Sequence, residues 1–181
     1  MSEALVIPGG ALGPAAGMLL YAGEVAERRG ATVHWHWWSG PPPKHTSPSA
    51  EPWVCDEIEP LLGEGTLLIG KSLGTNAAGL AASRNLPAVW LTPILTAPWV
   101  VAALERATAP MMLVGGTSDP VWEGEVAHRL SPHVLEVPGA GHGLQVPGPA
   151  ADSVAVLARV VAAMDDFLDA IGWPDDGKAG C

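Results

Sequence analysis

The sequence predicts a doubly wound α/β fold, in which a mainly parallel six-stranded sheet is flanked by helices. Short apolar runs alternate with longer segments of helical character, and each run ends in Gly, Pro or a small polar residue, as in βαβ units. The runs are continuously apolar rather than alternating, which indicates strands that are buried on both faces of a parallel sheet. Ligand sites of such sheets lie at the carboxyl ends of the strands, so functional residues are expected there.

The first half of the chain reads as three strands. The expected strands are 4–10, 32–38 and 66–70. A helix is expected from near Pro14 to a C-cap at Gly30. Residues 39–52 contain too many prolines for regular structure, so we expect a surface loop that leads to a helix over 54–62.

The second half repeats the same rhythm. The expected strands are 88–95, 111–116 and 133–139, with helices between them. The last helix is expected over 149–171, with one apolar stripe that faces the core. The residues of this stripe, at spacings of three and four, are Val154, Leu157, Val161, Met164, Leu168 and Ile171.

The composition predicts a single globular domain. The chain has 181 residues, of which 48% are hydrophobic and 15% are charged, so it can bury a sizeable core and disorder is not expected. Residues 1–173 are expected to form this domain, because Gly172 and Pro174 end the last helix. Residues 174–181 read as a flexible C-terminal tail.

The charge balance limits the partners that the protein is expected to have. Its formal net charge is -10, and nucleic acids and anionic membrane surfaces both require a positive face, so neither is expected as a partner. We expect a small-molecule substrate instead. The tryptophan-rich loops leave a homodimer open.

The sequence shows no sign of secretion or membrane insertion. Its N-terminus lacks the basic and apolar regions of a signal peptide, and no stretch has the apolar length of a membrane span. The two cysteines, Cys55 and Cys181, are too far apart in the chain to read as a disulfide framework or a paired metal motif. We therefore expect a cytoplasmic protein.

Three of the expected strands are followed by residues of a catalytic triad. Ser72 lies in "GKSLG" after the third strand, Asp119 in "GGTSDP" after the fifth and His142 in "GAGHGL" after the sixth. A serine hydroxyl needs an imidazole to accept its proton, and the imidazole needs a carboxylate to orient it. The order Ser, Asp, His at strand ends predicts a nucleophile, an acid and a base.

The residues around Ser72 fit a sharp turn from strand to helix. The glycines two residues on either side leave space for the turn, which pushes the serine hydroxyl outward. An acyl-transfer intermediate also needs two N–H donors for its oxyanion. The backbone N–H of Leu73 is one expected donor, and Gly10 in "PGGALG" is the other, with Ala11 as the alternative.

On these motifs the chain resembles a minimal, lidless α/β-hydrolase of the small intracellular kind common in bacteria. The resemblance covers nearly the whole chain and implies a serine hydrolase with Ser72 as nucleophile, Asp119 as acid and His142 as base, needing no cofactor. The chain differs from larger members in beginning at what corresponds to their third strand. It also carries Pro8-Gly9 where many members have His-Gly in the oxyanion loop.

Several other residues stand near the expected strand ends. Trp99, Trp122 and Trp38 are candidates for the wall of a substrate pocket, with helix packing as the alternative role for the first two. The histidines of "HWHWW" alternate as metal ligands do, but no third ligand accompanies them and no metal site is expected. Lys71 is expected to hold a solvated amine that points away from the nucleophile.

The expected function is hydrolysis of a small ester, thioester or lactone through an acyl-enzyme on Ser72. One alternative is a binding protein that keeps the fold without catalysis. Another is an acyltransferase or a biosynthetic cyclase that uses the same triad, because those reactions share the nucleophile, base and oxyanion hole.

Overall fold

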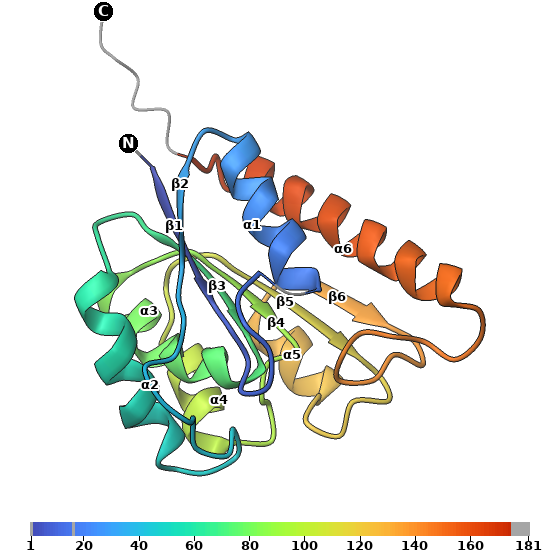
Figure 1. Cartoon of the computed structure of the whole chain (residues 1–181), viewed down its shortest axis with the longest axis horizontal. Coiled ribbons are helices and arrows are strands. Elements are labelled where there is room, and N and C mark those ends of the chain that lie inside the picture. The colour runs from blue at the N-terminus through green and yellow to red at the C-terminus, as the bar shows by residue number, and fades with distance from the viewer. Residues whose placement is uncertain (1, 16, 175–181) are drawn as a thin grey trace, which may run out of the picture.

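The computed structural model describes residues 2–15 and 17–174 and contains a six-stranded sheet in the order β2-β1-β3-β4-β5-β6 (Figure 1). All neighbouring strands pair in parallel. The strands are β1 (Glu3–Ile7), β2 (Thr32–Trp35), β3 (Leu67–Lys71), β4 (Ala88–Leu91), β5 (Met111–Gly116) and β6 (His133–Val137). Their carboxyl ends therefore lie at one edge, as the sequence predicts.

Helices cover both faces of the sheet, which confirms the doubly wound fold (Figure 1). On one face lie α1 (Met18–Arg28) and α6 (Ala150–Ala170). On the other lie α2 (Ala50–Ile58), α3 (Ala78–Arg84), α4 (Pro98–Glu105) and α5 (Gly124–Leu130). Both faces are covered because successive apolar residues of a strand point to opposite faces of the sheet. In β1, Leu5 and Ile7 pack toward α2 and α3, whereas Ala4 and Val6 pack toward α1 and α6.

Several elements are shorter than predicted. Strand β2 ends at Trp35 rather than 38, and β4 ends at Leu91 rather than 95. Beyond β4, Thr92 has a φ of 45°, which turns the chain out of the sheet, and Pro93 has no N–H to donate to a neighbouring strand. The first helix begins at Met18 rather than near Pro14.

The predicted apolar stripe of α6 is only partly right. Val154 is 63% exposed, and of the predicted stripe only Met164 and Leu168 are buried. The residues that face the core are Val156, Val160, Met164, Phe167 and Leu168. Alanine and valine occur nearly all round the first half of this helix, so more than one stripe has suitable spacing. Packing against the sheet and α1 selects which one is buried.

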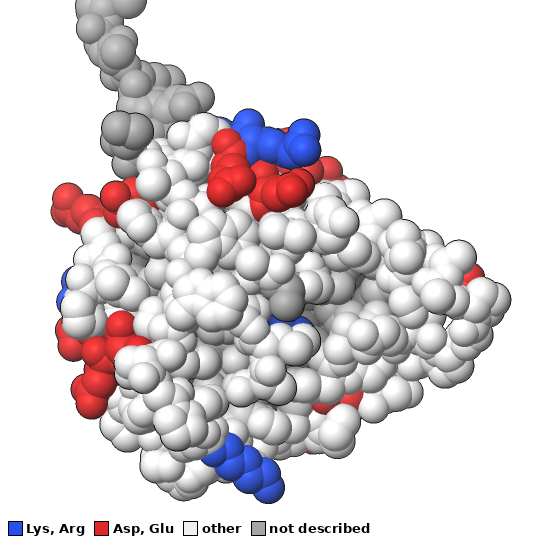
Figure 2. Space-filling model, viewed as in Figure 1, with Lys and Arg blue, Asp and Glu red and all other residues white. Residues whose placement is uncertain are grey.

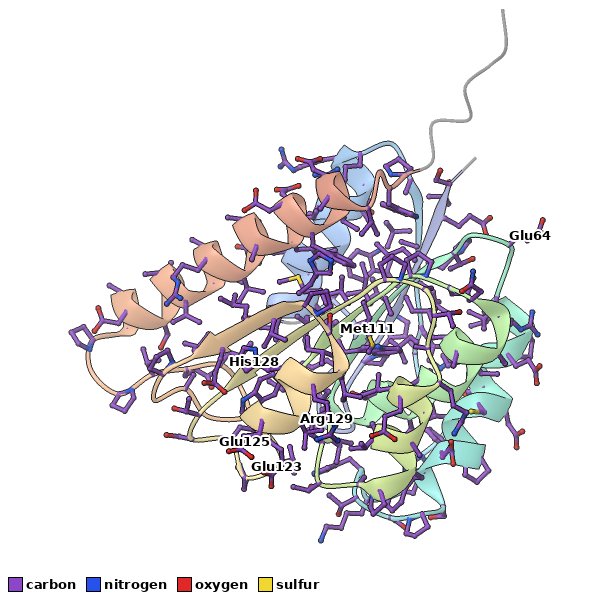
Figure 3. The ribbon with its side chains drawn as sticks, turned by 180° about the vertical axis from the view of Figure 1, so that it is seen from behind. Glu64, Met111, Glu123, Glu125, His128 and Arg129 are labelled. Atoms are coloured by element: carbon purple, nitrogen blue, oxygen red, sulfur yellow. The ribbon has the colours of Figure 1, made fainter. Side chains whose placement is uncertain are left out.

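Acidic and basic side chains lie side by side over α1, and other charged side chains stand apart on the same face (Figure 2). Arg29, next to α1, holds Asp165 and Asp169 of α6 at 3.1 and 2.7 Å. On the other side of the molecule, Glu123, Glu125, His128 and Arg129 lie around α5 and are exposed (Figure 3). An exposed ion pair contributes about 0–1 kcal/mol to stability, so the charges around α5 add little. The Arg29 side chain is only 18% exposed and also donates to the carbonyl oxygens of Asp165 and Trp173, so it ties α1 to α6 and to the chain that follows.

Two expectations concern the ends of the chain and its relation to membranes. The predicted tail falls almost wholly on residues 175–181, including Cys181, which lie outside the described residues. Of the helices in residues 2–15 and 17–174, none combines the length and apolar character needed to cross a membrane.

Candidate active site

Ser72 lies at the turn between β3 and the helix that follows it. It is the first residue of a short 3₁₀ helix, η2 (Ser72–Ala77), which continues into α3. Its φ of 50° falls in the left-handed region, which residues other than glycine seldom adopt and which costs free energy. A strained serine between strand and helix is typical of a nucleophile elbow.

Close packing leaves no space for side chains at Gly70 and Gly74. A β-carbon on Gly74 would lie 2.7 Å from the carbonyl oxygen of Ile7. A β-carbon on Gly70 would lie 2.5 Å from the ring of Trp90. Larger residues at either position would therefore displace the turn that carries Ser72.

The structure brings Ser72, His142 and Asp119 together in one chain of hydrogen bonds. The Nε2 atom of His142 lies 2.7 Å from Ser72 Oγ, and its Nδ1 atom lies 2.8 Å from Asp119 Oδ2. The Asp119 carboxylate is fully buried, and its Oδ1 accepts the backbone N–H of Val121 at 3.1 Å. A proton on His142 Nδ1 satisfies the carboxylate and leaves Nε2 to accept the serine proton.

The loop after β1 lies against the elbow. A β-carbon on Gly9 would lie 3.6 Å from Ser72 Cβ, and one on Gly10 would lie 3.8 Å from Leu73 Cδ2. These are ordinary contact distances. The two backbone segments from which the sequence predicts the oxyanion donors, Leu73 and Gly10, are therefore neighbours beside Ser72.

The prediction for Lys71 is wrong. Its side chain is mostly buried, and its Nζ donates to Thr92 Oγ1 at 3.0 Å and to the carbonyl oxygen of His142 at 3.1 Å. Burial lowers the pKa of the Lys71 ammonium, while Asp119 opposes this shift. Lys71 thus ties the loop of His142 to the ends of β3 and β4. This contact joins residues 71 positions apart, so the sequence carries no signal for it.

Replacement of Lys71 by methionine is expected to lower kcat. The methionine keeps the apolar stem but cannot donate to the backbone carbonyl of His142, so the loop that carries the imidazole loses one of the contacts that hold it. We expect kcat to fall roughly 10-fold, because small misplacements of catalytic groups are costly. Arg106→Met, at an exposed cation at the end of α4 that bonds the carbonyl of Ala102, is the control. Equal steady-state rates for the two variants would contradict this role.

A second histidine covers the triad. His45, from the proline-rich segment 39–52, stacks on the His142 ring with a centroid distance of 5.7 Å and an interplanar angle of 18°. Burial lowers the pKa of His45, and the neighbouring His142 and Lys44 lower it further. The sequence predicts a surface loop over this segment but does not single out His45.

The three candidate pocket tryptophans have different surroundings. Trp122 is 8% exposed, packs in the core and donates its Nε1–H to Glu136 at 2.7 Å, so little of it is open to a substrate. Trp99 is partly buried and donates to Asn76 Oδ1 at 2.9 Å. Trp38 alone contacts the oxyanion loop, through a hydrogen bond from its Nε1–H to the carbonyl oxygen of Gly9 at 3.0 Å.

Other reactive groups do not compete with Ser72. Burial and nearby carboxylates raise the pKa of the Cys55 thiol to about 11, so its nucleophilic thiolate is scarce at neutral pH. Of the two strand histidines, His36 faces Glu57 at 3.3 Å and His34 faces Glu3 at 3.7 Å. Over residues 2–15 and 17–174, no three metal-ligating side chains gather into a site.

Comparison with known proteins identifies the fold. No protein-family model and no curated protein sequence matches the chain. Est1E from Butyrivibrio proteoclasticus, solved with ferulic acid, superposes with a TM-score of 0.68 at 12% identity, covering 94% of this chain and 89% of that one.

Two further solved hydrolase structures superpose on the chain to a similar extent. An alpha-beta serine hydrolase homologue from Coxiella burnetii gives a TM-score of 0.65 at 15% identity, covering 92% of this chain and 84% of that one. Dienelactone hydrolase from Anabaena variabilis gives 0.62 at 17% identity, covering 94% and 86%. The likeness extends over nearly the whole length of both partners in each comparison. The chain therefore has the α/β-hydrolase fold.

Proposed function

We propose that the protein is a serine hydrolase that cleaves a small ester, thioester or lactone through an acyl-enzyme on Ser72. The observation that carries this proposal is the chain of hydrogen bonds from buried Asp119 through His142 to the hydroxyl of a strained serine. Structural turns do not need such a relay, whereas acyl transfer does.

Acylation begins when Ser72 Oγ attacks the carbonyl carbon and its proton passes to His142 Nε2. The carbonyl π electrons move to the oxygen, and the backbone N–H groups of Leu73 and Gly10 stabilise the resulting oxyanion. As the tetrahedral intermediate collapses, the bond to the leaving group breaks and His142 donates its proton to that group. The ester formed on Ser72 then awaits hydrolysis.

Deacylation repeats these steps with water. His142 accepts a proton from water, hydroxide attacks the acyl carbon, and Ser72 leaves with the proton returned by the imidazolium. Throughout, the Asp119 carboxylate stabilises the positive charge on the ring. The acid product and the leaving group, an alcohol or a thiol, carry away the atoms of one water molecule; a lactone instead opens to one hydroxy acid.

Labelling by a fluorophosphonate tests whether Ser72 is activated. We expect intact-protein mass spectrometry to find one adduct, because a hydroxyl held by a buried His-Asp pair attacks phosphorus far faster than an ordinary serine. Ser72→Ala should lose the adduct. Ser83→Ala is the matched control, since Ser83 is an exposed helix serine that bonds the carbonyl of Leu80.

An adduct that persists in Ser72→Ala would contradict the proposal. A folded wild-type protein that forms no adduct would favour the binding protein instead. Product analysis with water, alcohol and amine acceptors then separates hydrolysis from acyl transfer, and a cyclic product would indicate a cyclase.

A further inference from the structure

Trp38 contacts the loop after β1, in which Gly10 is the expected donor to the oxyanion. It lies three residues past the end of β2, and Gly9 lies two residues past the end of β1, which is the parallel neighbour of β2. Both segments therefore meet at the carboxyl edge of the sheet. There the indole Nε1–H donates to the Gly9 carbonyl oxygen at 3.0 Å.

This hydrogen bond controls the direction of the Gly10 N–H. The carbonyl of Gly9 and the amide of Gly10 belong to one planar peptide unit, and in a trans peptide the C=O and N–H groups point in opposite directions. An indole that holds the oxygen on one side therefore directs the N–H to the other. Glycines hold backbone direction poorly by themselves, so an outside contact is needed to fix this peptide plane.

The Gly10 amide is available to a ligand. It makes no backbone hydrogen bond within residues 2–15 and 17–174. The Cβ positions of Gly9 and Gly10 lie in contact distance of Ser72 and Leu73, at 3.6 and 3.8 Å. The peptide that Trp38 holds is thus the one beside the nucleophile.

The indole is itself held in place on several sides. Its centroid lies 4.6 Å from that of His36 in an edge-to-face arrangement and 4.9 Å from that of Trp53 on α2. Glu57 of α2 lies 3.3 Å from His36 Nε2 and also accepts from the Ser39 hydroxyl. The donor is therefore fixed before a substrate binds, as electrostatic stabilisation of a transition state requires.

We propose that Trp38 is a positioning residue of the oxyanion hole, which acts through the Gly9–Gly10 peptide and not by touching substrate. This inference rests on the proposed serine-hydrolase function. It assigns to Trp38 a role that differs from the pocket wall expected from the sequence. It also explains how an oxyanion loop built from glycines holds its donor steady.

Trp38→Phe tests the inference, because it removes the N–H and keeps an aromatic ring. With p-nitrophenyl esters as the probe, kcat is expected to fall roughly 10- to 100-fold with KM little changed, somewhat less than the loss of an oxyanion donor itself. Trp37→Phe is the matched control. Trp37 is the adjacent tryptophan and is 66% exposed. Its ring packs near Gly13, but its side chain makes no hydrogen bond to the loop within the described ranges, so this variant changes a neighbouring ring without removing a donor.

A trifluoromethyl ketone provides a second readout that a merely structural role would not move. Ser72 Oγ adds to its carbonyl carbon, the proton passes to His142, and the oxygen becomes the anion held by the oxyanion hole. The inhibition constant of Trp38→Phe should rise by the same factor by which kcat falls. If the two factors differ more than tenfold, Trp38 does not act on the oxyanion.

3-Benzothienylalanine at position 38 keeps the shape of the indole but has no N–H. It therefore tests the need for the hydrogen-bond donor even if Trp38→Phe disturbs folding. If the wild-type protein is active and the isostere variant has the same kcat, the role of Trp38 is overturned, whereas the proposed function stands. A wild-type protein that neither turns over esters nor reacts with a fluorophosphonate would overturn the proposed function and, with it, this inference.

Discussion

Ester turnover by Ser72→Ala is expected to fall by about 10⁴- to 10⁶-fold relative to the wild-type protein. Without the hydroxyl, no acyl-enzyme forms, and only binding and the oxyanion donors remain to accelerate direct attack by water. The decrease should appear in kcat, because the side chain contributes little to substrate affinity. Steady-state rates on p-nitrophenyl esters of increasing acyl length measure it.

A folded Ser72→Ala variant would show that the loss of turnover comes from the missing hydroxyl and not from unfolding. Ser72 is 6% exposed, and its hydroxyl bonds His142 at the site edge, so its removal leaves the core packing intact. Circular dichroism and the midpoint of thermal unfolding should match those of the wild type. Turnover by Ser72→Ala within 10-fold of the wild-type rate would contradict the acyl-enzyme mechanism, since the expected loss is larger by orders of magnitude.

Asp119→Asn is expected to lower kcat by about 10⁴-fold while the fold is kept. The asparagine oxygen can still accept the Val121 N–H, which the carboxylate accepts at 3.1 Å. Its NH₂ group then faces His142 Nδ1 and donates to it. The imidazole must place its proton on Nε2, where it can no longer accept the proton of Ser72.

The matched control is Asp165→Asn on α6. Asp165 is a half-exposed carboxylate that bonds Arg29 and lies outside the candidate site, so its loss should leave turnover unchanged. Steady-state kcat and KM for both variants provide the comparison. If Asp119→Asn keeps a tenth or more of wild-type kcat, Asp119 is not the acid of the triad.

Local signals carried the prediction of the strands and of Ser72. The apolar runs that form β3 and β5 are buried on both faces, and such strands are recognisable without knowing their partners. The glycines around Ser72 also report a local requirement, since the turn itself brings Gly70 and Gly74 against neighbouring atoms. The order of Ser72, Asp119 and His142 along the chain then follows from the order of the strands.

Element ends and buried faces were harder to predict. Apolar residues continue past β4 to Leu95, but the positive φ of Thr92 ends the strand at Leu91. In α6 the surplus of apolar positions left more than one stripe with helical spacing, and the predicted Val154 is exposed. Which face is buried depends on the surface that the sheet and α1 present.

The sequence by itself determined the α/β architecture and the three residues of the candidate triad, because strand burial, turn chemistry and strand order are written in short stretches of chain. Only the tertiary structure decided that Lys71 holds the loop of His142 and that Trp38 holds the Gly9 carbonyl. Both are single hydrogen bonds between segments far apart in the chain. From local pattern alone, the flexible side chain of Lys71 is assigned to solvent and the indole of Trp38 to a pocket wall. Only the folded arrangement brings each donor to its acceptor.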